Sequence, residues 1–215
     1  MRLLTLGTLR LEQSEFTKVK PLVLLAYLAS TSQERHLRKQ VAGFLWANAK
    51  DSNNSLQRAI TVLEKENSNL FDRSHTEIWT DIDCDANELK RAFAAENYLK
   101  VIELYKGPYL EKAQSESWGK EFEDWLYEQQ GQYLNLARLA YLKLGEEAAG
   151  EGDFEKACRY AVTGWNLSPE LPPEDYLLRY YTLFVACDNP LVQKVEEEAE
   201  TYEAAMPDIN REQAR

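Results

Sequence analysis

Residues 136–169 read LARLAYLKLGEEAAGEGDFEKACRYAVTGWNLSP, two segments of helical apolar periodicity around a short polar turn. Gly152 stands at the turn, where helices commonly end on a residue of positive φ, and Pro169 stands where the second segment ends. Gly145 and Gly164 are small residues within the two segments, which allows two helices to cross closely. The stretch therefore predicts a helical hairpin.

The spacing in this stretch also follows the tetratricopeptide pattern. The matching positions are Tyr141, Leu144, Gly145, Ala157, Gly164, Leu167 and Pro169. Ala148 and Ala161 depart from it, because they stand where the pattern has aromatic residues. Possible turns at Asn97-Tyr98 and Asp188-Asn189 predict about three degenerate repeats in the second half of the chain. The alternative is an ordinary helical hairpin whose spacing matches by coincidence.

The length of the chain limits the number of domains, and its cysteines indicate the redox compartment. A chain of 215 residues can hold one large domain or two small ones. Its three cysteines, Cys84, Cys158 and Cys187, are odd in number and form no CxxC pair, which favours reduced thiols in a cytoplasm over a disulfide framework. The longest apolar run, residues 21–29, is too short to span a membrane, and we expect no signal peptide.

The net charge of −11 is unevenly distributed. Residues 1–90 contain 12 basic and 12 acidic side chains, whereas residues 91–215 contain 13 basic and 24 acidic ones. Residues 18–58 have seven basic side chains against two acidic ones. An acidic protein can bind nucleic acid through one basic face, because salt confines the field to about 10 Å. The alternative is a solvated surface of mixed charge.

Residues 1–85 combine strands with helices. Residues 2–12 alternate around Gly7, which predicts two short strands or one bent hairpin, and residues 76–82 predict the last strand of a hairpin. Between them, apolar periodicity predicts three helices, at residues 21–29, 36–47 and 51–67. This order of elements predicts a winged helix-turn-helix, whose third helix is the one that a DNA groove receives.

Everything after residue 85 is predicted to be helical. The expected helices cover residues 86–95, 98–105, 120–150, 154–167, 176–187 and 191–205. The fold class is therefore mostly α: a winged helix-turn-helix domain (α+β) at residues 1–85, followed by an all-α tetratricopeptide-like array at residues 86–215. We expect the aromatic residues of the second part to pack between helices, namely Trp118, Trp125, Trp165, Tyr176, Tyr180 and Tyr181.

Several segments together carry a family resemblance. In the first half they are Leu4–Leu9, Lys20–Ala29, Arg38–Trp46, Asn53–Leu63 and Ile78–Ile82, and in the second half Tyr105–Leu110, Trp125-Leu126 and Gly152–Phe154. In order and spacing they resemble bacterial transcriptional activators of the antibiotic-regulatory-protein class, over about residues 2–204. That class joins an OmpR-like winged helix to a bacterial transcriptional activator domain of tetratricopeptide type. The resemblance implies a cytoplasmic DNA-binding transcription regulator whose helical repeats mediate dimerisation or bind other proteins.

The third helix departs from that family. Its members usually carry several arginines there, whereas Gln57, Val62 and Glu64 take those positions here and only Arg58 remains. Each missing charge weakens DNA binding and flattens its salt dependence. The alternative function is therefore a non-enzymatic interaction module whose winged helix no longer binds DNA. Family members often continue into a nucleotide-hydrolysing module, so we expect a short member or a fragment.

The candidate DNA site lies on the polar side of the third helix. Asn and Gln can bind adenine edges and Arg can bind guanine, while basic side chains nearby hold phosphates. The predicted base-reading residues are Asn53, Asn54, Gln57, Arg58 and Thr61, and Lys65 lies further along the same polar side as another DNA-binding candidate. The predicted phosphate contacts are Lys18, Lys20, Arg38 and Lys39.

Catalytic and metal sites have no support in the sequence. His36 and His75 lack metal-ligand spacing, and no nucleophile signature is present. The carboxylates of Glu121, Glu123 and Asp124 are expected on a solvated helix face. We therefore expect no enzyme activity, no cofactor, no metal and no membrane partner; the expected partners are double-stranded DNA, a protein bound by the repeats and a possible second copy of the chain.

Overall fold

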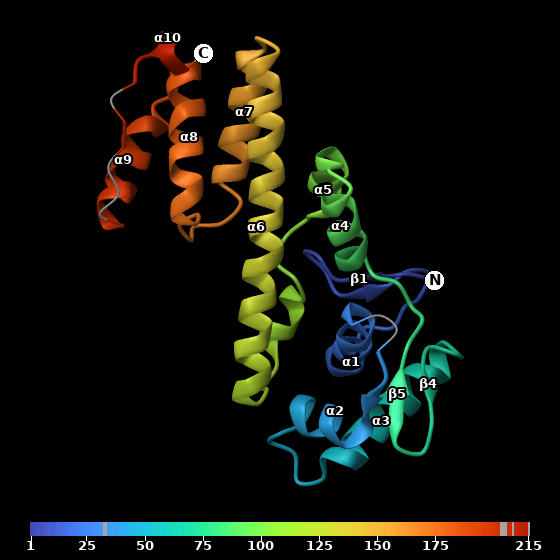
Figure 1. The fold of residues 1–215 in the computed structure, drawn as a ribbon. Coiled ribbons are helices and arrows are strands. Elements are labelled where there is room, and N and C mark those ends of the chain that lie inside the picture. Colours follow the sequence, from blue (N-terminus) through green and yellow to red (C-terminus); the bar gives the residue numbers. More distant parts are fainter. Residues whose placement is uncertain (32–33, 203–205, 208, 215) are drawn as a thin grey trace. The chain divides into compact units, whose positions relative to one another are not determined.

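The computed structural model describes residues 1–31, 34–202, 206–207 and 209–214. Within these residues the protein is mostly helical, with two small sheets (Figure 1). Its contacts divide the chain into two compact units. Unit 1 comprises Met1–Arg91 and Leu104–Tyr133, and unit 2 comprises Ala92–Glu103 and Leu134–Arg215.

The chain begins with a two-stranded antiparallel hairpin, β1 (Leu3–Leu4) and β2 (Arg10–Leu11). Gly7 turns between the strands with a φ of 70°. A Cβ atom at this position would lie 2.5 Å from the carbonyl oxygen of Lys106, so only glycine fits there. The two short strands predicted for residues 2–12 are confirmed, and they pair with each other as a hairpin.

Three helices follow in unit 1: α1 (Val19–Ser30), α2 (Arg38–Leu45) and α3 (Ser52–Glu66). Pro21 lies in the first turn of α1, where its missing N–H is harmless. Four of the eight buried residues of α1 are leucines, and six successive residues from Pro21 to Ala26 are buried. The three predicted helices are therefore confirmed, with ends that move by one to two residues.

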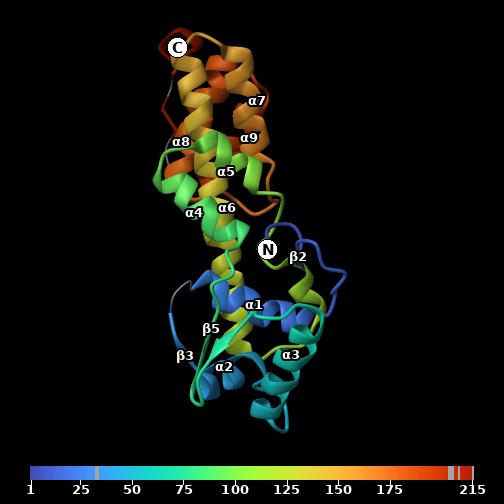
Figure 2. The same cartoon turned by 90° about the vertical axis from the view of Figure 1, so that its right-hand side faces the viewer.

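A second sheet contains three antiparallel strands, β3 (His36–Leu37), β4 (Asp72–Arg73) and β5 (Glu77–Trp79), in the order β3-β5-β4. The strand predicted at residues 76–82 is confirmed at Glu77–Trp79 and ends three residues earlier than predicted. The helix predicted from His36 is wrong at its first two residues. They form β3 because they pair with Ile78 and Glu77 of β5, side by side in Figure 2.

Unit 1 also includes residues well beyond the expected boundary at residue 85. After α4 (Asp85–Ala94), residues 104–133 return to it through a 3-10 turn, η1 (Glu111–Ser115), and the first part of α6 (Lys120–Gly150). Tyr109, Leu110 and Phe122 are fully buried there. The boundaries of the compact units thus differ from those of the two expected domains, because unit 1 also contains residues 104–133.

Unit 2 is built from helices alone in the described residues. They are α5 (Tyr98–Leu104), the second part of α6, α7 (Phe154–Trp165), α8 (Glu174–Cys187), α9 (Leu191–Thr201) and α10 (Arg211–Ala214). The sequence predicted all of them except α10. The predicted end of the ninth helix, residues 203–205, lies outside the described residues.

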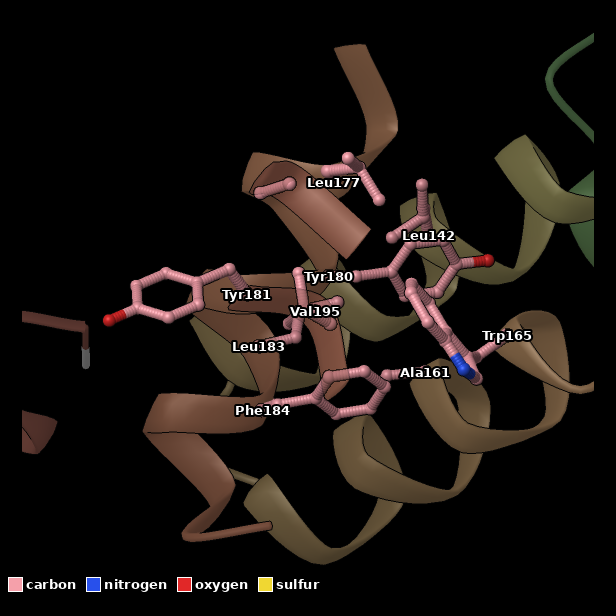
Figure 3. Packing of buried hydrophobic residues seen from close by; sticks show 10 residues of the cluster. Leu142, Ala161, Trp165, Leu177, Tyr180, Tyr181, Leu183, Phe184 and Val195 are labelled. Atoms are coloured by element: carbon pink, nitrogen blue, oxygen red, sulfur yellow. The ribbon is translucent and has the colours of Figure 1, made fainter. Parts of the chain in front are cut away.

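Aromatic rings fill the core of unit 2 (Figure 3). Trp165 of α7 stands edge-on to Tyr180 and Phe184 of α8, with ring centroids 5.2 and 6.0 Å apart. Val195 of α9 and Leu142 of α6 close the cluster and are fully buried. The packing role expected for Trp165, Tyr180 and Tyr181 is confirmed.

The α6–α7 hairpin has the turn and the close crossing that residues 136–169 predicted. Gly152 turns the chain with a φ of 81°, and the Asp153 carboxylate caps α7 by accepting a 3.0 Å hydrogen bond from the Lys156 amide. A Cβ atom at Gly145 would lie 3.4 Å from the carbonyl oxygen of Ala157, and one at Gly164 would lie 2.7 Å from the Cβ atom of Tyr141. Small residues are therefore required where these helices cross.

Candidate nucleic-acid interface

Helix α3 presents one buried face and one exposed face. Leu56, Ile60 and Leu63 are buried at the spacing of one helix side. The Asp51 carboxylate starts the helix by accepting a 2.9 Å hydrogen bond from the Asn54 amide. Because the apolar face fixes the rotation of the helix, the polar residues between these positions must point to solvent. The exposed ones are Asn53, Asn54, Gln57, Arg58, Thr61 and Lys65.

A chain of hydrogen bonds holds the middle of this face. Arg38, at the start of α2, donates from its guanidinium to the Gln57 side-chain oxygen at 2.9 Å. The Gln57 side-chain nitrogen lies 3.2 Å from the Thr61 hydroxyl, which in turn donates to the Gln57 backbone oxygen. The structure therefore brings together three residues that the sequence placed in one site, and it fixes the orientation of the Gln57 amide.

The remaining predicted phosphate contacts are not equivalent. Lys39 is exposed in the first turn of α2, next to Arg38, and Lys18 is exposed at the start of α1. Lys20 is only half-buried, but its ammonium group donates to the Ser117 carbonyl oxygen at 3.1 Å and lies 5.1 Å from the centroid of the Trp118 ring. Lys20 is thus engaged within unit 1, whereas Lys18 and Lys39 point to solvent.

The β4–β5 hairpin is tied to α3 by an ion pair. Arg73 of β4 donates to the Glu64 carboxylate of α3 at 2.8 Å. Ser74 closes the hairpin turn, because its hydroxyl accepts from the Glu77 amide at 3.0 Å. Arg35 lies over the Trp79 ring at 4.5 Å, next to the same hairpin. The exposed hairpin turn and the exposed face of α3 are consequently held as neighbouring surfaces of one unit.

A hollow lies at the N-terminal end of α3, and the sequence reasoning missed one of its residues. Lys50 is exposed, directly precedes the capping Asp51, and lines this hollow together with Asn53, Asn54 and Arg58. An ammonium group beside a helix N-terminus adds to the positive end of the helix dipole. Its position directly before a capping residue was a usable sequence signal, because the residue before an N-cap lies beside the first turn of the helix.

The charges on this surface are open to solvent. Within the described residues, no carboxylate lies within ion-pair distance of Lys39, Lys50 or Arg58. Within the described residues, Arg58 therefore forms no ion pair with an acid of its own surface. An unpaired cation binds a phosphate or a base edge without first breaking a salt bridge, so this surface suits an anionic partner.

Partial burial changes the pKa of His36, which lies in β3 just before α2. The ring lies 2.7 Å from the Thr31 hydroxyl and 5.4 Å from the Tyr27 ring, measured between centroids. Desolvation lowers the pKa of His36 below its usual value, although the Glu34 carboxylate opposes this effect. His36 thus favours the neutral form and supports the entry into α2.

Neither a metal site nor a membrane-spanning helix is found in the part of the chain that the structure describes. In residues 1–31, 34–202, 206–207 and 209–214, no group of three or more His, Cys, Asp or Glu residues is placed to hold a metal ion. No helix in the same ranges has the length and apolar character needed to cross a membrane. A comparison with models of protein families finds no match, and a comparison with curated proteins finds none either.

Proposed function

We propose that this chain is a DNA-binding transcription regulator in which unit 1 acts as a winged helix-turn-helix. The order of three helices with a three-stranded antiparallel sheet supports this assignment. Helix α3 is the recognition helix, and the β4–β5 hairpin is the wing. Unit 2 is a tetratricopeptide-like array that binds another protein or a second copy of the chain. This arrangement is the one implied by the resemblance to the antibiotic-regulatory-protein class.

The exposed face of α3 carries the proposal. Asn53, Asn54 and Gln57 have side-chain amides that can bind an adenine edge with two hydrogen bonds, and Arg58 has the guanidinium that binds guanine in the same way. The unpaired Lys39 and Lys50 can neutralise phosphates, which give affinity but no sequence information. No enzymatic step is required of any of these residues.

Two substitutions test the division of roles. A preferred duplex is first selected from random sequences, and binding to it is compared with binding to random duplex DNA. Arg58→Ala is expected to lower the discrimination between the two by about 1–3 kcal/mol, because one bidentate base contact is lost. Lys39→Ala is expected to weaken binding to both duplexes equally and to reduce the salt slope by about one.

A control substitution separates local contacts from overall charge. Lys194→Ala removes the same charge as Lys39→Ala, but from an exposed position on α9 of unit 2. It is expected to leave discrimination and salt slope unchanged. If Lys194→Ala and Lys39→Ala had equal effects, the phosphate role of Lys39 would be wrong.

One observation favours a second function, a protein-docking module that does not bind DNA. Glu64 stands on α3 between the helix and the β4–β5 hairpin, and its ion pair with Arg73 reduces the free positive charge there. A surface with so few phosphate contacts has low non-specific affinity for DNA. The docking function is distinguished by the absence of any salt-dependent binding to duplex DNA at low ionic strength.

A further inference from the structure

Two cysteines of unit 2 lie on adjoining helices at the same level. Cys187, at the end of α8, donates from its sulfur to the Phe154 carbonyl oxygen of α7 at 3.3 Å. Two residues further on, the Asn189 side-chain nitrogen donates to the Cys158 sulfur of α7 at 3.2 Å. The segment 187–189 therefore contacts α7 at both Phe154 and Cys158.

Helix geometry brings both cysteines to the same turn of α7. Phe154 and Cys158 are four residues apart in α7, so they lie one above the other on one face of the helix. The carbonyl oxygen that Cys187 contacts is also the one that accepts the Cys158 amide proton within the helix. Asp188, with a φ of 56°, ends α8 and turns Asn189 onto the same face. This places the Cys158 and Cys187 side chains across a single α7–α8 contact.

The third cysteine has a different environment. Cys158 and Cys187 are each half-buried, so a small oxidant reaches both of them. Cys84 is fully buried in unit 1, and burial raises the pKa of its thiol to about 11. Because the thiolate is the reactive form, Cys84 is inert under conditions in which exposed thiols react. Cys84 can therefore serve as an internal control that stays reduced when the other two cysteines are oxidised.

We propose that Cys158 and Cys187 are a peroxide-responsive pair that forms a disulfide between α7 and α8. One thiolate attacks a peroxide oxygen, which breaks the O–O bond and leaves a sulfenic acid and one water molecule. The second sulfur attacks that sulfenic sulfur, the S–S bond forms, and a second water molecule leaves. Two thiols are oxidised by two electrons in total, and one hydrogen peroxide is reduced to two water molecules.

The disulfide acts on the stability of unit 2. It closes the loop between residues 158 and 187, which contains the α7–α8 connection and most of α8. Cross-linking a loop of this size restricts the unfolded chain, so the oxidised protein unfolds at a higher temperature. The peroxide level of the surroundings would thereby set the rigidity of the α7–α8 pair, independently of what unit 1 binds.

The test uses the reduced full chain and a moderate excess of hydrogen peroxide. Remaining thiols are then alkylated under denaturing conditions and peptides are mapped by mass spectrometry. We expect a linked Cys158–Cys187 peptide within one chain, an alkylated Cys84, and a rise in the thermal midpoint of roughly 5–10 °C that a dithiol reductant reverses. Cys158→Ser and Cys187→Ser should each abolish the shift, whereas Cys84→Ser should retain it.

Other products would overturn the proposal. Sulfinic acid at either position without a linked peptide would show that the two sulfurs do not meet. A disulfide between two chains, or one that includes Cys84, would do the same. If the serine variants unfold in the reduced state at the temperature of the parent chain, a retained shift in either of them would also contradict it.

Discussion

At the scale of single residues, a buried carboxylate joins the beginning of the chain to the start of α4. Asp85 is 4% exposed and accepts hydrogen bonds from the Thr5 amide at 2.8 Å, the Thr5 hydroxyl at 2.5 Å and the Leu6 amide at 3.2 Å. Within the described residues these donors have no other hydrogen-bond acceptor, so they would be unpaired without it. Asp85 thus supplies the hydrogen-bond acceptors for the buried polar groups of Thr5 and Leu6.

Replacing this carboxylate should be costly. Asp85→Ala leaves two backbone amides buried without acceptors, and we expect the free energy of unfolding to fall by about 2–4 kcal/mol. Asp81→Ala is the matched control, because Asp81 is exposed in the segment just before α4. Denaturant titration of both variants measures the difference, and equal stabilities would contradict the role given to Asp85.

The half-buried His36 should make stability depend on pH. Its folded pKa is lowered by desolvation, so between the unfolded and folded pKa values the unfolded chain binds more protons. Stability is therefore fully present above the unfolded value of about 6.5 and falls as the pH drops below it. His36→Gln should remove this step in thermal unfolding from pH 7.5 to 5.5, whereas exposed His75→Gln should retain it. If the pH-dependent step in stability persisted in His36→Gln, another titrating group would be its cause.

Residue roles were predictable from sequence only where they are local. The capping role of Asp51 follows from the Asp-Ser-Asn-Asn run that precedes the apolar face of α3. The role of Asp85 was not predictable, because its partners Thr5 and Leu6 are about 80 residues away in the chain. The hydrogen bond from Arg38 to Gln57 was not predictable either, because it depends on how α2 packs against α3.

At the scale of elements, the close crossing of α6 and α7 is the sharpest constraint. A Cβ atom at Gly145 would already lie 3.0 Å from a Leu183 methyl carbon and 3.4 Å from the Ala157 carbonyl oxygen. Ala157 is fully buried, so no space exists there for a longer side chain. The crossing therefore depends on small residues on both helices.

A larger residue at this crossing should destabilise unit 2. Ala157→Leu adds three carbon atoms to a filled contact, and we expect a loss of about 1–3 kcal/mol in the free energy of unfolding. Thr163→Leu places the same side chain on the exposed face of α7 and serves as the control. Thermal or denaturant unfolding compares them. A Thr163→Leu loss as large as that of Ala157→Leu would show that the crossing is not the cause.

Helices were predicted better than strands, for a physical reason. The 31 residues of α6 carry a long periodic signal, and Gly131 within it meets open space, so the helix passes through it unbroken. Strand β3 has two residues, too few for any alternation, and exists because β5 offers it backbone partners. The winged-helix and repeat assignments of these elements stay proposals.

At the scale of the whole molecule, unit 1 needs a segment that comes late in the chain. Pro108 accepts from the Gly7 amide, and Leu110 donates to the Thr5 carbonyl oxygen at 2.8 Å. The Trp125 ring lies 5.4 Å from the ring of Tyr27 and 5.8 Å from that of Phe44. Periodicity could not reveal this, because a helix pattern says which face is apolar but not what covers it.

Truncation tests this division of the chain. A chain that ends at Arg91 loses the buried Tyr109, Leu110 and Phe122, so we expect no cooperative thermal transition from it. A chain that ends at Tyr133 keeps these residues and should unfold cooperatively. Circular dichroism during heating distinguishes them. A cooperative transition of the shorter chain at the temperature of the longer one would contradict the packing role of residues 104–133.

We propose above all that the exposed face of α3 and its neighbouring cations bind duplex DNA. The most direct measurement is the binding constant of the full chain for a labelled random duplex, by fluorescence anisotropy, between about 50 and 200 mM salt. With Lys18, Lys39, Lys50 and one or two further cations on phosphates, we expect a log–log slope of about −3 to −5. Absence of binding at the lowest salt concentration, or a slope near zero, would contradict the claim and favour the protein-docking function.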